Sequence, residues 1–178
     1  AIKTRLIALP DTTKIVFSRD NAWEFPQNAV LVKNFYLELE AGKASSRKIV
    51  ETRFLVKRTT GEQWDGFSYM WNEAATDASL LEASATKKFL IKDNSVPGGQ
   101  FEQTYYFPSR TDCSTCHTPA AGYVLGVRTA QINKQHSYGA VSDNQLRSYN
   151  HIRLFTTNIG ENYAGYPKLP DPLDEQRP

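Results

Sequence analysis

The chain has 178 residues, of which 40% are hydrophobic and 22% are charged, and its net charge at neutral pH is +2. This length suits one domain or two small ones, and the near-neutral charge, with no Lys/Arg run longer than two residues, gives no basis for nucleic-acid binding. No apolar stretch approaches the roughly 20 residues of a membrane span, and the N-terminus lacks the apolar core of a signal peptide.

The first part of the chain, residues 1–107, is dominated by a hydrophobic period of two, which is typical of strands. Near the N-terminus, RLIAL (5–9) and KIVFS (14–18) flank the turn residues PDTT, so they are expected to form a hairpin. In LVKNFYLELE (31–40), the apolar residues Leu31, Phe35, Leu37 and Leu39 are predicted to share the core face.

The next strands extend this pattern. KIVETRFLVKR (48–58) presents Val50, Phe54 and Val56 as its apolar side, against the polar residues Glu51, Arg53 and Lys57. In WDGFSYMW (64–71), Phe67, Tyr69 and Trp71 share one face and Met70 points to the other. The stretch 72–84 is expected to be a short helix or a helical loop. KKFLIK (87–92) and QFEQTYYF (100–107) are predicted to pair across the SVPGG turn.

After Pro108 the pattern becomes helical. TAQINK (129–134) and SDNQLRSYNHI (142–152) are predicted helices, the second capped by Ser142 or Asp143. The fold class is therefore α+β, mainly β. We expect an antiparallel β-sandwich-like body over 1–107, a small α-helical segment over 108–160 packed on it as one structural unit, and a proline-rich tail or linker over 161–178.

The only two cysteines, Cys113 and Cys116, stand three apart, and His117 follows directly. A redox dithiol or a disulfide is one interpretation, although no βαβ unit surrounds the pair. A structural zinc site needs four ligands, and the two remaining histidines are far apart in the chain. The C-x-x-C-H order is typical of c-type haem attachment. It predicts one haem c, with thioethers at Cys113 and Cys116 and His117 as the proximal iron ligand.

Three residues are candidates for the sixth iron ligand. His136, in a predicted loop after the helix at 129–134, is favoured because that loop could bring its imidazole over the open haem face. His151, at the end of the second predicted helix, and Met70, the only methionine, are the alternatives. An open sixth position is the remaining choice. Arg110, three residues before Cys113, is a candidate contact for a haem propionate.

Several segments resemble a bacterial c-type cytochrome (haem c) domain family whose members occur alone or within large exported proteins, some with quinoprotein dehydrogenase or carbohydrate-active modules. The resemblance runs from about Ile7 to Phe155 and rests on VLVKNFYLE, IVETRFLVKR, FSYMWNEAATDASLL, FPSRTDCSTCHTPAAGYVLG and TAQINK with YGAVSDNQLRS. It implies a β-rich body ahead of one haem, attached at Cys113 and Cys116 with His117 as proximal ligand. It weakens Met70 as a ligand.

These observations predict a monohaem cytochrome domain that transfers single electrons in the periplasm or outside the cell, because haem c is attached after export. The expected partner is a redox protein: a dehydrogenase, a copper oxygenase or another cytochrome. Two alternatives stay open. One is a peroxidase-like haem enzyme with an open sixth site, and the other is a glycan-binding module with an accessory haem. On this hypothesis either a signal peptide has been removed, or the chain is a domain of a larger secreted protein.

Overall fold

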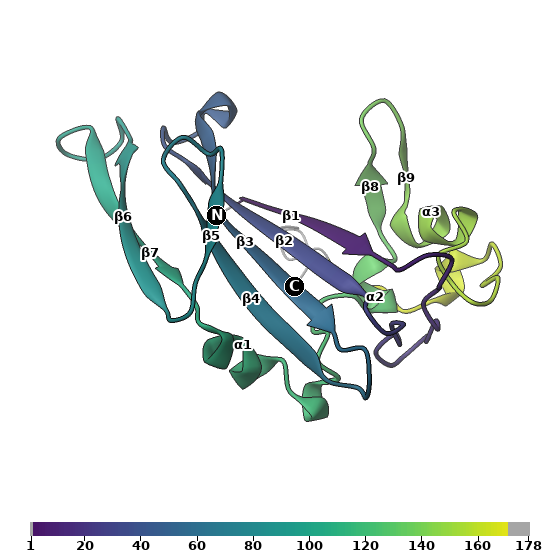
Figure 1. Cartoon of the computed structure of the whole chain (residues 1–178). Helices are drawn as coiled ribbons and strands as arrows, with labels where there is room; N and C mark the ends of the chain where they lie inside the picture. Colours follow the sequence, from purple (N-terminus) through teal and green to yellow (C-terminus); the bar gives the residue numbers. More distant parts are fainter. Residues whose placement is uncertain (1, 171–178) are drawn as a thin grey trace. The chain divides into compact units, whose positions relative to one another are not determined.

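The computed structural model describes residues 2–170 and is mainly β, with antiparallel sheets and three α-helices among those residues. Figure 1 shows the elements along the chain. The strands are β1 (Ile2–Ala8), β2 (Val30–Glu38), β3 (Arg47–Lys57), β4 (Trp64–Trp71), β5 (Ala78–Leu80), β6 (Ala85–Lys92), β7 (Gln100–Phe107), β8 (Gln135–Ser137) and β9 (Ser142–Asn144). The helices are α1 (Arg110–Cys116), α2 (Thr129–Ile132) and α3 (Gln145–His151).

The chain divides into two compact units. Unit 1 comprises residues 1–8 and 27–118, and unit 2 comprises residues 9–26 and 119–178. This division differs from the predicted one at 107/108, because α1 packs against β4 and so belongs with the β-rich body. Residues 9–26 belong with the C-terminal part, where Ile15 forms a β-bridge with Phe155.

Unit 1 is built on a five-stranded antiparallel sheet in the order β1-β2-β3-β4-β5. A β-bulge interrupts the pairing of β2 with β3: Phe35 lies opposite Glu51 and Tyr36 opposite Ile49, so Val50 has no partner. The extra residue lets both Val50 and Glu51 be buried, at 2% and 0% exposure. The predicted polar side of this strand is therefore not an exposed one, since Lys57 is buried as well as Glu51.

The hairpin of β6 and β7 packs on one face of this sheet (Figure 1). The two together enclose a core cluster of six buried residues, three from the sheet and three from the hairpin: Phe35, Leu37, Val50, Phe89, Ile91 and Phe107. Met70 packs against this cluster, while Tyr69 on the other face contacts Phe54 with ring centroids 5.4 Å apart. The predicted hairpin over 87–107 and the predicted opposition of Met70 and Tyr69 are both confirmed.

Two predicted elements near the strands are wrong. The segment at 5–9 does not form a hairpin with 14–18, because β1 pairs along its whole length with β2. The 14–18 segment instead makes isolated bridges, Ile15 with Phe155 and Val16 with Glu24. The stretch 72–84 is not a helix. Its Asn72 side chain accepts the Thr76 N–H, which favours a turn over a helix, and β5 follows on β4.

Unit 2 packs around aromatic rings. The Phe17 ring lies edge-on to Phe155 and Tyr166, at centroid distances of 5.2 and 5.5 Å, and Trp23 lies edge-on to Phe155 at 5.0 Å. The side-chain amide nitrogen of Asn133 donates to the carbonyl oxygens of Tyr163, Tyr166 and Pro167. The predicted tail is therefore packed at 163–167. Its part at 171–178 lies outside the described residues.

The two C-terminal helical predictions are confirmed in position but are shorter than expected. The first, predicted at 129–134, is α2, which ends at Ile132. The second begins at Gln145, and its cap is Asn144, whose side-chain oxygen accepts the N–H groups of Leu146 and Arg147. Within residues 2–170, no helix combines the length and the apolar character that crossing a membrane requires.

Candidate functional site

The two cysteines lie on α1, a helix of seven residues whose start is fixed by a capping box. The Ser109 hydroxyl accepts the N–H of Asp112 at 3.2 Å, and the Asp112 carboxylate accepts the N–H of Ser109 at 2.9 Å. The Tyr106 hydroxyl of β7 also donates to this carboxylate, at 2.7 Å. These bonds lower the pKa of Asp112, so the carboxylate stays ionised. Asp112 lies in the first turn of α1, where its negative charge interacts favourably with the positive end of the helix dipole. The end of β7 thus sets where α1 begins.

The motif residues follow one another along this helix. Cys113 and Cys116 are three residues apart, so their side chains lie on the same side of α1, and both thiols are free. Cys113 is half-buried and Cys116 is exposed. His117 forms the C-terminal cap, and its backbone N–H donates to the Cys113 carbonyl at 3.0 Å. One short helix therefore presents two thiols and an imidazole in sequence.

Cys113 is seated on β4 by a close approach that only glycine permits. A Cβ atom placed on Gly66 would lie 2.7 Å from the Cys113 Cβ and 3.1 Å from its Sγ. The neighbouring residue on the same face, Ser68, is 1% exposed, and its hydroxyl has no hydrogen-bond partner among the described residues. It lies close enough to Cys113 to oppose slightly the rise in pKa that burial causes. Because Gly66 has no side chain, Cys113 can pack directly against the backbone of β4.

A buried charged group lies on the same sheet face as Cys113. Glu51 accepts two hydrogen bonds from the Arg53 guanidinium, at 2.7 and 2.9 Å, and one from the Tyr105 hydroxyl at 2.7 Å. Burial, followed by the bond to Glu51, raises the pKa of Tyr105 strongly, so its hydroxyl remains a donor. Burial also raises the pKa of Cys113, with Arg53 opposing and Glu51 reinforcing that effect.

Arg110 is held on the other face of β4. Its guanidinium donates to the Asp65 carboxylate at 3.1 Å and lies 4.6 Å from the centre of the Phe67 ring. Asp65 and Phe67 alternate along β4 with Gly66 and Ser68, so they point away from Cys113. In this structure Arg110 ties α1 to the edge of the sheet. Its predicted contact with a haem propionate stays a prediction.

The candidates for a sixth ligand are distributed over both units. Met70 lies in unit 1, partly buried against the core cluster. His136 lies in unit 2 on β8, not in a loop, where it is exposed and its ring meets Tyr138 edge-on at 4.7 Å. His151 is exposed at the end of α3. Among residues 2–170, no group of three or more His, Cys, Asp and Glu side chains is arranged to hold a metal ion.

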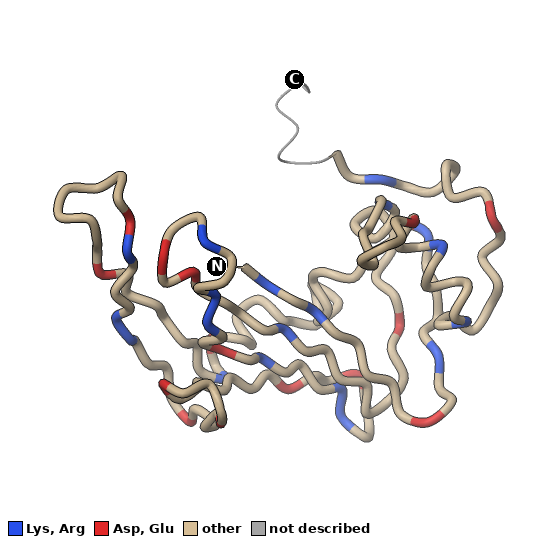
Figure 2. Tube along the Cα trace, turned by 90° about the horizontal axis from the view of Figure 1, so that it is seen from above, with Lys and Arg blue, Asp and Glu red and all other residues tan. Residues whose placement is uncertain are grey.

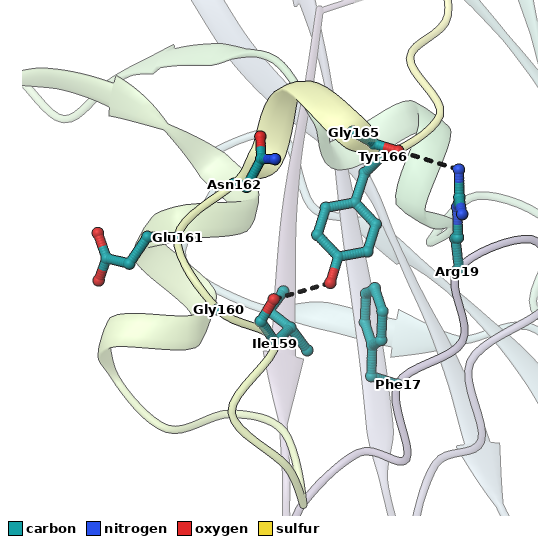
Figure 3. A pocket seen from close by; sticks show the side chains of 8 residues that line it. All are labelled: Phe17, Arg19, Ile159, Gly160, Glu161, Asn162, Gly165 and Tyr166. Carbon is teal, nitrogen blue, oxygen red and sulfur yellow. Dashed lines mark hydrogen bonds between the residues drawn. The ribbon is translucent and has the colours of Figure 1, made fainter.

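Unit 2 has an open cavity of about 520 Å³ beside its aromatic core (Figure 3). Two of its polar side chains bond within the fold: the Tyr166 hydroxyl donates to the Ile159 carbonyl at 2.7 Å, and Arg19 donates to the Gly165 carbonyl at 3.0 Å. None of the predicted site residues lines it. The cavity therefore has no part in the candidate site.

The donor set on α1 fits a covalently attached haem, because it offers two free thiols on one helix face and an imidazole at the helix end. Sequence reasoning missed Gly66 and Ser68, which lie against Cys113, and the buried Glu51 on the same sheet face. One signal was present, since a glycine inside a strand often marks a close approach of another chain segment. Comparison of the chain with protein-family models, with curated proteins and with solved structures gives no match.

Proposed function

We propose that this chain is a monohaem c-type cytochrome domain that transfers single electrons in the periplasm or outside the cell. The observation that carries the proposal is the C-x-x-C-H sequence on a capped helix, with both thiols free and on one side. A haem bound there would supply the one-electron couple. The chain itself holds the tether: Gly66 and Ser68 seat Cys113, while Cys116 and His117 follow at the end of the helix.

The roles of the three motif residues follow from their places. Cys113 and Cys116 would hold the haem through thioether bonds to its vinyl groups, and His117 would be its proximal ligand. The sixth ligand proposed from the sequence is His136, with His151 and Met70 as alternatives. Met70 packs with the core residues of unit 1, which favours a packing role for it.

The decisive experiment expresses the full chain behind a bacterial export signal together with the haem c maturation system. We expect a red protein with a pyridine haemochrome of c-type and an intact mass raised by one haem. Cys113→Ser and Cys116→Ser should each reduce covalent attachment, and Cys113→Ser with Cys116→Ser should abolish it. Ser114→Ala, an exposed position on the same helix, is the matched control. A colourless wild-type protein that folds and is exported with active maturation would overturn the proposal.

The optical and magnetic spectra of the same protein decide the sixth ligand. His136→Ala is expected to convert a low-spin spectrum to a high-spin one, while His151→Ala and Met70→Leu leave it low-spin. A wild-type spectrum that is already high-spin, together with peroxide turnover, would favour a haem enzyme over an electron carrier.

A further inference from the structure

A row of cations crosses the strands of unit 1 on the face that carries Cys113. The pairing places Arg5 of β1 opposite Lys33 of β2, Lys33 opposite Arg53 of β3, and Arg53 opposite Ser68 of β4. Directly paired residues share a sheet face, so these side chains lie on one side. Ser68 marks the end of the row that touches Cys113. Figure 2 shows basic positions on adjacent strands of this sheet.

Two of these cations, Lys33 and Arg53, lie over the Phe35 ring together with Lys3 of β1, which pairs with Phe35. The Phe35 ring centre lies 5.7 Å from the Lys3 ammonium, 5.1 Å from the Lys33 ammonium and 4.4 Å from the Arg53 guanidinium carbon. We call Lys3, Arg5 and Lys33 the cationic row. Arg53 is excluded because Glu51 neutralises it.

Among the described residues, no ion pair neutralises the cationic row, although the buried Glu51 carboxylate acts on Lys33 from a distance. Within residues 2–170, no acidic side chain forms an ion pair with Lys3, Arg5 or Lys33. Burial, then repulsion from Arg5, Lys3 and Arg53, lowers the pKa of Lys33. Lys33 is half-buried, whereas Lys3 and Arg5 are exposed beside it, so an anion bound next to Lys33 would offset the repulsion that it meets there. The arrangement is that of a site for a carboxylate.

The distance from Cys113 to this row matches a tethered porphyrin. From β4 to β2 is two strand spacings, or roughly 10 Å. In haem, the two vinyl groups occupy one edge of the ring and the two propionate carboxylates occupy the opposite edge. A ring attached through Cys113 on β4 and extended over β3 would therefore bring its carboxylates to the ammonium and guanidinium groups of Lys33 and Arg5.

We propose that the cationic row binds the propionate carboxylates of a haem tethered at Cys113, so that the porphyrin lies along this sheet face from β4 towards β1. The inference rests on the proposed function, since it needs the tether. It assigns the propionates to residues of β1 and β2. Arg110, which lies on the other face of β4 with Asp65, is assigned a structural role.

The first test is lysine acetylation of the wild-type holoprotein, compared with the full-length double variant Cys113→Ser, Cys116→Ser that cannot attach haem. The rate at Lys33 should fall severalfold in the holoprotein. Lys88, an exposed lysine of β6 that pairs with Glu102, should react equally in both forms and serves as the internal control. This test needs no substitution in the row.

The second test measures the reduction potential of haem-loaded Lys33→Gln, Arg5→Gln and the two combined. Loss of a positive charge beside the propionates stabilises the oxidised, more positive haem, so the potential should fall in each variant and fall further in the double variant. Lys88→Gln is the matched control for loss of one lysine charge and should leave the potential unchanged. Lys33→Arg should restore it.

Two results separate this inference from the proposed function. A haem-loaded protein in which Lys33 reacts as fast as in the haem-free form, with potentials equal to that of Lys88→Gln, overturns the inference while the cytochrome function stands. Protection of Lys33 only when an acidic partner protein is added also overturns it. Failure of the wild type to attach haem overturns both.

Discussion

Gly66 is the residue on which the seating of Cys113 depends, because no other side chain leaves room for the 2.7 Å approach of the Cys113 Cβ. Gly66→Ala is expected to push α1 away from β4 and to lower the free energy of unfolding by about 1–3 kcal/mol, the usual cost of overpacking a buried contact. Urea denaturation followed by circular dichroism measures the loss.

The control for this variant is Gly126→Ala, since a Cβ at Gly126 meets nothing within 4 Å and its backbone is not left-handed. It should leave the unfolding midpoint unchanged. If Gly66→Ala were as stable as Gly126→Ala and attached haem equally, the close approach of Cys113 to Gly66 would not contribute to stability.

The two thiols of the haem-free chain should differ in reactivity. Cys113 is half-buried with a raised pKa, whereas Cys116 is exposed. Because the thiolate is the nucleophile, Cys113 should react with iodoacetamide severalfold more slowly than Cys116 at pH 8, and its rate should keep rising at higher pH. The variants Cys113→Ser and Cys116→Ser report each rate alone. Equal rates and equal pH dependence in the two variants would contradict the seating of Cys113 on β4.

At the scale of the elements, Asp65 joins α1 to the sheet. It accepts two hydrogen bonds from Arg58, at 2.8 and 3.0 Å, and one from Arg110 of α1. Arg58 above all, with Arg110, lowers the pKa of Asp65 below its ordinary value of 3.8. A folded-state pKa below the unfolded one gives stability that is complete above pH 3.8 and is lost as the pH falls through the lower folded value.

Asp65→Asn should therefore unfold at lower temperature than the wild type at pH 7, and the difference should shrink as the pH falls below the ordinary carboxyl range. Thermal melts from pH 7 to pH 2 measure it. Glu102→Gln, which removes an exposed ion pair within the β6–β7 hairpin, is the control. It should change the melting temperature little at any pH. If the difference in melting temperature between Asp65→Asn and the wild type stayed constant with pH, the Asp65 carboxylate would not stabilise the fold through a lowered pKa.

The elements that the sequence predicted correctly are those with local signals. Alternation identifies the core residues Phe35 and Leu37 of β2, and the Pro-Gly-Gly turn identifies the β6–β7 hairpin. The pairing of β1 was missed because its partner, β2, begins 22 residues after β1 ends, and a nearer apolar segment competed for it. The bulge at Val50, which buries Glu51, has no signature in the sequence.

The candidate site divides in the same way. Cys113, Cys116 and His117 form a contiguous motif, so the sequence alone indicates them. Their surroundings come from strands brought together by register, with Ser68 opposite Arg53 and Lys33 opposite both Arg5 and Arg53. Cross-strand neighbours of this kind are separated by about 15 to 30 residues, and only the folded sheet reveals them.

At the scale of the whole molecule, the candidate site lies in unit 1, whereas unit 2 has a separate aromatic core. Every residue of the C-x-x-C-H motif and of the cationic row belongs to unit 1, and His136 and His151 belong to unit 2. The discontinuous composition of unit 2, residues 9–26 with 119–178, could not be predicted from local patterns. The bridge between Ile15 and Phe155 joins positions 140 residues apart.

Asn133 is the polar centre of unit 2. Besides its three carbonyl acceptors at 163, 166 and 167, its side-chain oxygen accepts the Asn144 amide at 2.8 Å, and the residue is 4% exposed. Asn133→Ala removes these four bonds and leaves the buried Tyr163 carbonyl unsatisfied, which costs about 1–3 kcal/mol for a group that water cannot reach. Hydrogen exchange should therefore speed up at the amide of Tyr166, which donates to the Tyr163 carbonyl, and at the amide of Leu169, which donates to the Ala130 carbonyl of α2.

The matched control is Asn21→Ala, an exposed asparagine of the same unit, which should exchange as the wild type does. Covalent haem staining should be retained in Asn133→Ala, because the attachment residues and Gly66 are all in unit 1. Unchanged exchange at Tyr166 and Leu169 would show that the Asn133 bonds do not hold this segment. Loss of staining in Asn133→Ala, with exchange in unit 1 unchanged, would show that attachment needs more than the α1 helix and its seat on β4.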